Sequence, residues 1–237
     1  MPNYNNYSIS NGKGKLYLKS AEPKEGYEKV TYGVDNKTTY HKFVDRFQGV
    51  LKSFAQTEAT KSDGTKLHFL EATFIDGEDQ NKLSVPLKNS KSNFTDEVKV
   101  LISSLNNAEV GQNYTVSVTK KKTVSKTNGK EYENLNMYIN YIERLGENGK
   151  GLSTGFINPN DVPKAIKDDD PDLGVTWDWK PVNRFYAQKI KEISEKFTTT
   201  QTTSTPKAET KLPPQSASNA FEPADTSKKE EFLDLPF

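Results

Sequence analysis

The chain has 237 residues, a hydrophobic fraction of 32% and a formal net charge of +1. It contains no cysteine and only two histidines, which excludes disulfide scaffolds and cysteine-ligated metals and disfavours histidine-centred catalytic triads. No apolar run has the roughly 20 residues of a membrane span and the N-terminus lacks a signal-peptide pattern, so we expect a soluble cytoplasmic protein.

The first 37 residues are expected to form an N-terminal extension that is partly flexible. Residues 1–15 are rich in Asn, Gly, Ser and Lys, a composition typical of mobile chain. Ordered structure is expected to begin near the segment KLYLKS, at residues 15–20.

Three strands are predicted next, at residues 49–59, 66–76 and 81–89. The dipeptides Asp63-Gly64 and Asp76-Gly77 lie between them and are typical of hairpin turns, so the three strands form a meander. The orientation of the first strand stays open, because the phenylalanines of residues 43–54 also fit helical spacing.

An amphipathic helix is predicted within residues 94–111. Thr95 is suited to cap its first turn, and one face carries the apolar side chains Val98, Leu101, Ile102 and Leu105. After Gly111 the pattern predicts a long hairpin about Asn128-Gly129, with apolar residues alternating on both arms.

Three strands, a helix and two more strands are the order of an OB-fold. We therefore predict a mainly β protein with a five-stranded OB barrel at residues 38–150 and one helix between strands three and four. A generic α+β sandwich gives the same order of elements, but the single helix at that position favours the barrel.

Residues 151–197 are predicted to form an ordered extension. Its last part is a helix expected to dock on the barrel or on a second subunit through Phe185, Ile190, Ile193 and Phe197. Trp177 and Trp179 are expected to pack on the barrel. Residues 198–231 have almost no large apolar side chains and are predicted to be a disordered linker, which leaves residues 232–237, FLDLPF, as a protein-interaction tip.

OB barrels often bind single strands through a basic groove and aromatic side chains on which bases stack. Strand alternation places two tyrosines of the fifth strand, with Asn134 and Asn136, on the face opposite the core. The hairpin tip adds five lysines. We predict these single-stranded-DNA contacts: Arg46, Lys52, Phe54, Phe69, Lys82, Lys88, Lys120, Lys121, Lys122, Lys126, Lys130, Tyr132 and Tyr138.

Alternatives remain for several of these residues. Phe54 also fits a core position, and the hairpin lysines also fit a solvated hairpin that protects a sheet edge. His68 alternates with the inward set and is expected to be buried. The acidic run DDDPD is interpreted as a solvated loop rather than a metal-dependent nuclease site, so no catalytic residue, metal or cofactor is predicted.

The end of the chain, Asp234-Leu235-Pro236-Phe237, resembles the tip of the bacterial single-stranded-DNA-binding protein family, which follows an OB domain and a low-complexity linker. The resemblance implies that Phe237 is the anchor in an apolar pocket of partner proteins, with Pro236 presetting the chain and Leu235 adding contact. Asp234 would supply negative charge. Lys228 and Lys229 dilute the acidity that the family tip usually has.

The long segments on either side of the predicted barrel are more similar to bacteriophage-encoded members of this class, which would act in the host cytoplasm. The resemblance implies a protein that is not an enzyme and coats single-stranded DNA without sequence specificity in replication, recombination and repair. Its tip would recruit polymerase, helicase-primase or nuclease, and a homo-oligomer is left open. The alternative is a protein-binding OB module, such as a phage structural or assembly adaptor.

Overall fold

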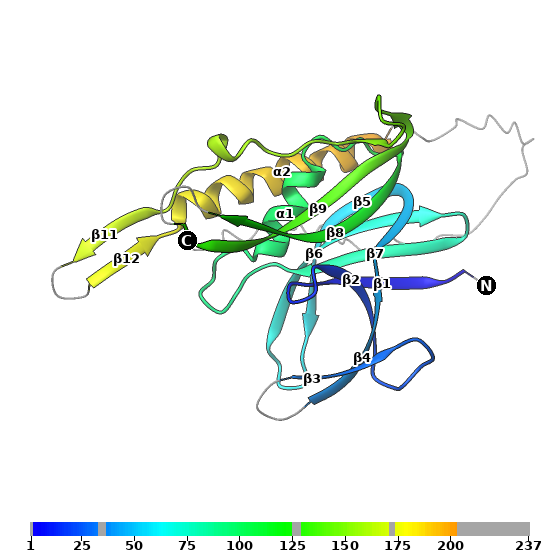
Figure 1. Cartoon of the computed structure of the whole chain (residues 1–237), viewed down its shortest axis with the longest axis horizontal. Helices are drawn as coiled ribbons and strands as arrows, with labels where there is room; N and C mark the ends of the chain where they lie inside the picture. The colour runs from blue at the N-terminus through cyan, green and yellow to red at the C-terminus, as the bar shows by residue number, and fades with distance from the viewer. Residues whose placement is uncertain (1, 33–36, 125–128, 171–173, 203–237) are drawn as a thin grey trace, which may run out of the picture.

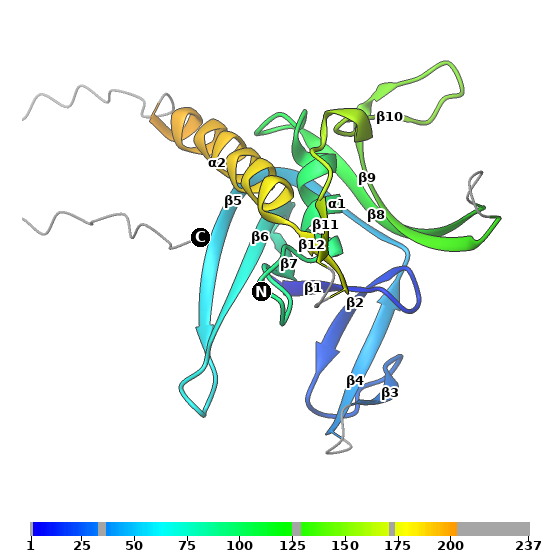
Figure 2. The same cartoon turned by 90° about the vertical axis from the view of Figure 1, so that its left-hand side faces the viewer.

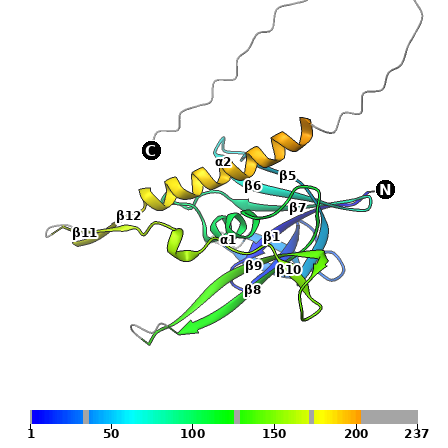
Figure 3. The ribbon, with the colours of Figure 1, turned by 90° about the horizontal axis from the view of Figure 1, so that it is seen from above.

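A computed structural model describes residues 2–32, 37–124, 129–170 and 174–202 (Figure 1). In these residues ten strands form one open sheet and two further strands form a separate ribbon. Two helices, α1 (Asp96–Leu105) and α2 (Lys180–Thr202), lie next to each other on one side of the sheet (Figures 1 and 3). The predicted mainly β class is confirmed.

The strands of the sheet are listed in chain order as β1 (Tyr4–Ser10), β2 (Lys15–Ser20), β3 (Glu28–Tyr32), β4 (Lys37–Val44), β5 (Arg46–Thr60), β6 (Lys66–Asp76), β7 (Asp79–Pro86), β8 (Asn113–Val124), β9 (Glu131–Leu145) and β10 (Gly151–Ser153). Their order across the sheet is β10-β9-β8-β5-β6-β7-β1-β2-β4-β3. A short 3-10 helix (Pro159–Asp161) and the ribbon strands β11 (Ile166–Asp170) and β12 (Gly174–Asp178) precede α2.

The predicted meander is present as β5, β6 and β7, joined by antiparallel pairing. Gly64 and Gly77 both have positive φ, +81° and +61°, as tight hairpin turns require. The Asp63 carboxylate accepts a hydrogen bond of 2.8 Å from the Thr65 backbone N–H, which closes the first turn. Each turn is therefore formed by the dipeptide that predicted it.

Helix α1 begins as the sequence predicts. The Thr95 hydroxyl accepts a hydrogen bond of 3.2 Å from the Val98 N–H, and the predicted apolar face is fully buried. The buried Ser104 hydroxyl donates to the Met137 carbonyl at 2.8 Å and fixes α1 against β9. The predicted hairpin is formed by β8 and β9, although Asn128 lies outside the described residues.

The sheet differs from a five-stranded barrel at its N-terminal side. β7 pairs in parallel with β1, and the sheet continues through β2 to β4 and β3, so residues expected in a partly flexible extension are strands. The polar composition of residues 1–15 gave no indication that Tyr7 and Ile9 are buried, whereas the buried Leu16 lies in the segment where ordered structure was expected to begin. The Tyr7 ring stacks on Phe47 with centroids 4.5 Å apart. Residue 37 therefore does not mark the edge of a separate unit.

The turn between β1 and β2 lies directly against β8. Gly14 has φ +61°, and a Cβ there would come within 2.7 Å of the Lys120 backbone nitrogen. Only glycine fits this close approach without moving the backbone. The contact brings β2 and β8 together although no ladder joins them in the described residues.

Helix α2 packs on α1 and β5 of its own chain. Its buried side chains are spaced three or four residues apart and are Val182, Tyr186, Ile190, Ile193 and Phe197, while the predicted Phe185 is only half-buried. The helix extends to Thr202, so the first residues of the expected linker are helical and the rest lie outside the described residues. Within the described ranges, no helix has the length and apolar character to span a membrane.

Candidate nucleic-acid interface

The predicted tyrosines lie together on one face of the β8–β9 hairpin. Antiparallel residues that are directly opposite share a face, and the register pairs Tyr132 with Thr123 and Tyr138 with Ser117. The intervening pairs on this face are Asn134 with Lys121 and Asn136 with Thr119. We call these eight residues the tyrosine face. Tyr132 is 47% exposed and Tyr138 is half-buried.

Arg46 extends the tyrosine face onto β5. It is opposite Ser117, which is in turn opposite Tyr138, so the three residues form one row across β5, β8 and β9. The Arg46 side chain is exposed. A guanidinium and a phenol ring therefore lie two strands apart on the same face, where a phosphate and a stacked base can be bound together.

An additional aromatic residue, Phe156, lies against the tyrosine face. Its ring meets Tyr138 edge-on with centroids 5.7 Å apart, and 47% of Phe156 is exposed. The segment that carries it is attached to both β9 and α1. The Thr154 backbone N–H donates to the Ile139 carbonyl at 2.9 Å, and the Thr154 hydroxyl donates to the Ser104 carbonyl at 2.7 Å. Phe156 was not predicted from the sequence, because its only local signal was one aromatic residue in an irregular segment.

The hairpin lysines do not form one cluster. Lys121 belongs to the tyrosine face, whereas Lys120 and Lys122 alternate to the opposite face. There Lys120 pairs with Glu133, and the Nζ of Lys122 lies 3.7 Å from a carboxylate oxygen of Glu131. The Lys120 ammonium holds the pKa of the Glu133 carboxyl below its ordinary value. Of the other two predicted lysines, Lys130 is exposed and Lys126 lies outside the described residues.

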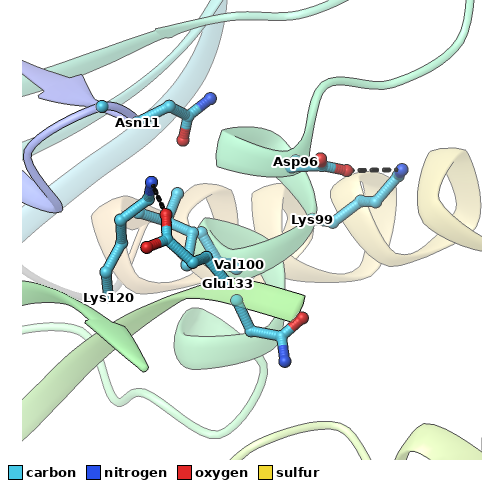
Figure 4. A pocket seen from close by; sticks show the side chains of 9 residues that line it. Asn11, Asp96, Lys99, Val100, Lys120 and Glu133 are labelled. Atoms are coloured by element: carbon cyan, nitrogen blue, oxygen red, sulfur yellow. Dashed lines mark hydrogen bonds and ion pairs between the residues drawn. The ribbon is translucent and has the colours of Figure 1, made fainter. Parts of the chain in front are cut away.

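The opposite face of the hairpin borders a cavity of about 510 Å³ between β8, β9, the β1–β2 turn and the start of α1 (Figure 4). Two ion pairs line it, Lys120 with Glu133 and Lys99 with Asp96, the second at 2.9 Å. Each positive charge is matched by a negative one, so this cavity does not favour a polyanion. Lys120 is therefore assigned to the cavity rather than to the tyrosine face.

Phe54 is in the core, as the alternative interpretation proposed. It is 4% exposed and its ring stacks on Phe197 of α2 with centroids 6.1 Å apart. Helix α2 covers the face of β5 on which Phe54 lies, and this contact is not visible from local sequence. Phe54 is therefore removed from the set of DNA-contacting residues.

The remaining predicted contacts on β5, β6 and β7 are dispersed. Lys52 is exposed at a register shift between Leu51 and Ser53. Phe69 is half-buried on the predicted outward face. Lys82 is half-buried and pairs with Glu71 at 3.1 Å, and the exposed Lys88 lies 5.7 Å from the Phe94 ring centroid. The β5–β6 and β8–β9 hairpins project in different directions (Figure 2), so these residues do not join the tyrosine face.

The two histidines have different environments, and that of His68 differs from the prediction. His68 has the predicted inward alternation, but its side chain is 56% exposed and lies 3.7 Å from Glu58, because the hairpin extends beyond the core at that point. The expectation that His68 is buried was wrong. His41 is the buried histidine, and Thr39 Oγ1 lies 3.0 Å from its Nε2.

The predicted tip residues Asp234, Leu235, Pro236 and Phe237 lie outside the described residues.

In the part of the chain that the structure describes, no group of three or more His, Asp or Glu side chains is arranged to hold a metal ion. The candidate interface consists of the tyrosine face, Arg46 and Phe156. Compared with known proteins, the chain matches no family model, no curated protein and no solved structure.

Proposed function

We propose that this chain is a single-stranded-DNA-binding protein that uses the tyrosine face as its stacking platform. The observation that carries the proposal is the combination of Tyr132, Tyr138 and Phe156 with Lys121 and Arg46. Stacking of a base on an aromatic side chain contributes about 1–3 kcal/mol without regard to sequence. Phosphates are bound by the adjacent cations, so the affinity falls as salt rises.

The order of the elements supports a divergent OB-fold as the framework for this activity. β5, β6, β7, α1, β8 and β9 follow one another as the strands and helix of an OB-fold do, and β5 pairs with both β6 and β8. In this proposal, β1 occupies the edge of β7 that a closed barrel would use for its last strand. The β8–β9 hairpin is then the binding loop between the fourth and fifth strands.

The proposed activity is binding without chemistry. A protein that coats DNA without regard to sequence protects transient single strands in replication, recombination and repair. It also removes the hairpins that single-stranded DNA forms by base pairing with itself. The C-terminal tip recruits polymerase, helicase-primase or nuclease through Phe237 and Asp234. The segment between α2 and the tip acts as a tether that raises the local concentration of the recruited enzyme. We assign the chain to the bacteriophage type of this class, on the resemblance of its tip and its long flanking segments.

A protein-binding module is the second candidate, and the β11–β12 ribbon favours it. This ribbon projects from the body (Figure 1), and its Trp177 is 54% exposed, contrary to the expectation that it packs on the barrel. Trp179 is 40% exposed and lies near α1, with the Lys99 ammonium 5.5 Å from its ring centroid. Exposed apolar side chains of this kind are typical of protein contacts.

A titration with oligo-dT and with duplex DNA over a range of salt concentrations separates the two candidates. The proposed function predicts that oligo-dT binds more tightly than duplex and that its affinity falls steeply with salt. A protein-binding module predicts no preference between the two forms of DNA. Equal and weak binding of both would therefore reject the proposed function.

A further inference from the structure

Three aromatic rings lie together on strands β2 and β4, on the face opposite the core. Tyr17 is opposite Phe43, and His41 shares their face because it is two residues before Phe43. The Tyr17 and His41 rings stack with centroids 4.2 Å apart, and Phe43 lies 6.0 Å from Tyr17 and 5.9 Å from His41. Leu16 and Leu18 alternate to the other face, where Leu16 is fully buried in the core.

The three rings are not required to fill a core between elements. Strands β2, β3 and β4, which we call the wing, project from the body on the side away from both helices (Figures 1 and 2). Tyr17 and Phe43 are half-buried, so each presents ring surface to solvent. His41 is buried beneath them, and Thr39 Oγ1, 3.0 Å from its Nε2, fixes the orientation of the ring that supports Tyr17.

Three lysines lie around the rings, and two of them form exposed ion pairs. The Lys13 ammonium lies 3.9 Å from the centroid of Phe43 and also pairs with Glu28. Lys19 is directly opposite His41 on the same face, and Lys15 pairs with Asp45 at 2.9 Å. Residues 1–46 contain eight Lys/Arg and five Asp/Glu, a net charge of +3 in a chain whose total is +1. The N-terminal strands therefore carry the basic excess of the whole chain.

We propose that the wing is a second contact surface for single-stranded nucleic acid. A base stacks on Tyr17 or Phe43, and the ammonium of Lys13, which lies over Phe43 when no strand is bound, turns to a phosphate. Lys19 supplies a second phosphate contact beside His41. The site uses the same chemistry as the tyrosine face, namely rings that accept any base and cations that accept any phosphate. The proposal rests on the proposed function, since it extends the path of the same strand.

The wing and the β8–β9 hairpin project in different directions from the body (Figure 2), so one strand reaches both surfaces only if it is long enough. A short oligonucleotide of about 8 residues fills one surface, whereas one of about 30 residues exceeds the roughly 4 to 16 nucleotides that a single OB-fold binds. Loss of the wing therefore weakens the binding of long strands more than that of short ones.

The test measures the fluorescence anisotropy of labelled oligo-dT of both lengths with the full chain and a variant carrying Tyr17→Leu and Phe43→Leu. Leucine retains apolar packing against the sheet but removes the stacking rings. We expect the affinity for the long oligo-dT to fall about tenfold and that for the short one to change less than twofold. Oligo-U of the same lengths shows whether the wing accepts RNA as well as DNA.

A second pair of variants does not disturb the rings. Lys19 is on the ring face of the wing and Lys29 is on the other face, opposite Tyr40, and both side chains are exposed. Lys19→Gln is expected to reduce the salt slope for long oligo-dT by about 0.7, the value for one phosphate contact on a single strand, while Lys29→Gln leaves it unchanged.

The outcomes distinguish this proposal from the proposed function. If the wing variants bind long oligo-dT as the unmodified chain does while Tyr132→Ala weakens it, the wing is not a nucleic-acid contact and the proposed function stands. A wing that docks protein gives that same result. If the unmodified chain shows no preference for single strands at either length, both proposals are rejected.

Discussion

Arg46 on β5 and Tyr138 on β9 are linked through Ser117, which is paired with both of them from the strand between. Because adjacent strands are about 4.8 Å apart, the backbones of Arg46 and Tyr138 are separated by about 10 Å across the row. The row connects the cationic and aromatic parts of the proposed interface on one face of the sheet.

Replacement of Tyr132 or Tyr138 by alanine is expected to weaken the binding of oligo-dT about tenfold, because each change removes one stacking surface. Tyr138→Ala also removes the edge-on contact with Phe156. Isothermal titration calorimetry at a fixed salt concentration measures the effect.

Phenylalanine variants at the same two positions provide the matched control. They keep the ring and lose only the hydroxyl, so their affinities should remain close to that of the unmodified chain. If the phenylalanine variants lose as much affinity as the alanine variants, hydrogen bonding by the hydroxyl rather than stacking carries the interaction.

The two faces of the β8–β9 hairpin predict different effects for neighbouring lysines. Lys121 is on the tyrosine face opposite the neutral Asn134, whereas Lys122 is on the other face and pairs with Glu131. Lys121→Gln should reduce the salt slope of oligo-dT binding by about 0.7, and Lys122→Gln should change it much less. Equal changes in slope for the two variants would contradict the assignment of faces.

Burial of His41 predicts that the protein loses stability in mild acid. Burial is the main cause that lowers the pKa of His41, and the nearby charges of Lys19 and Lys13 lower it further. The unfolded chain binds a proton near the ordinary pKa of about 6.5, and the folded chain does so only at lower pH. The contribution of His41 is therefore complete above pH about 6.5 and is lost as the pH falls toward the folded-state pKa.

Urea unfolding between pH about 5 and about 8 measures this loss. His41→Gln should remove part of the decline in the free energy of unfolding below pH about 6.5. His68→Gln is the control, since that side chain is exposed and its replacement should leave the decline in place. A decline that is identical in the unmodified chain and in His41→Gln would show that other groups cause it.

Deletion of residues 234–237 is expected to leave oligo-dT binding unchanged or slightly tighter, because the deleted segment removes one acidic side chain and no part of the tyrosine face. The same deletion should abolish binding to a purified replication polymerase or helicase-primase, measured by surface plasmon resonance. Phe237→Ala, which retains Asp234, should lose most of the partner binding. Full partner binding by the chain that lacks residues 234–237 would show that the tip does not recruit these partners.

The sequence predicted the elements whose signals are local. Thr95, Gly64 and Gly77 act at the positions that they mark, and alternation places Tyr132 and Tyr138 on one face as predicted. These features depend on backbone conformation and on the period of a strand, and both are properties of a few consecutive residues.

The parts that were not predicted depend on residues distant in sequence. The parallel pairing of β1 with β7 joins Asn5 to Asn81, and no local pattern encodes it. Helix α2 buries Phe54, and the hairpin register decides that Lys120 meets Glu133. Whether a given side chain contacts the core, an ion-pair partner or solvent is determined by such long-range packing.

Photo-crosslinking of oligo-dT to the full chain, followed by mass spectrometry of tryptic peptides, measures directly whether the tyrosine face contacts single-stranded DNA. Cleavage after Lys130 and Arg144 yields one peptide, residues 131–144, that contains both tyrosines of the face, and residues 151–164 form another that contains Phe156. We expect crosslinks in these two peptides with oligo-dT and none with duplex. Crosslinks that occur only elsewhere, such as in residues 67–82 of β6 and β7, would contradict the proposed function.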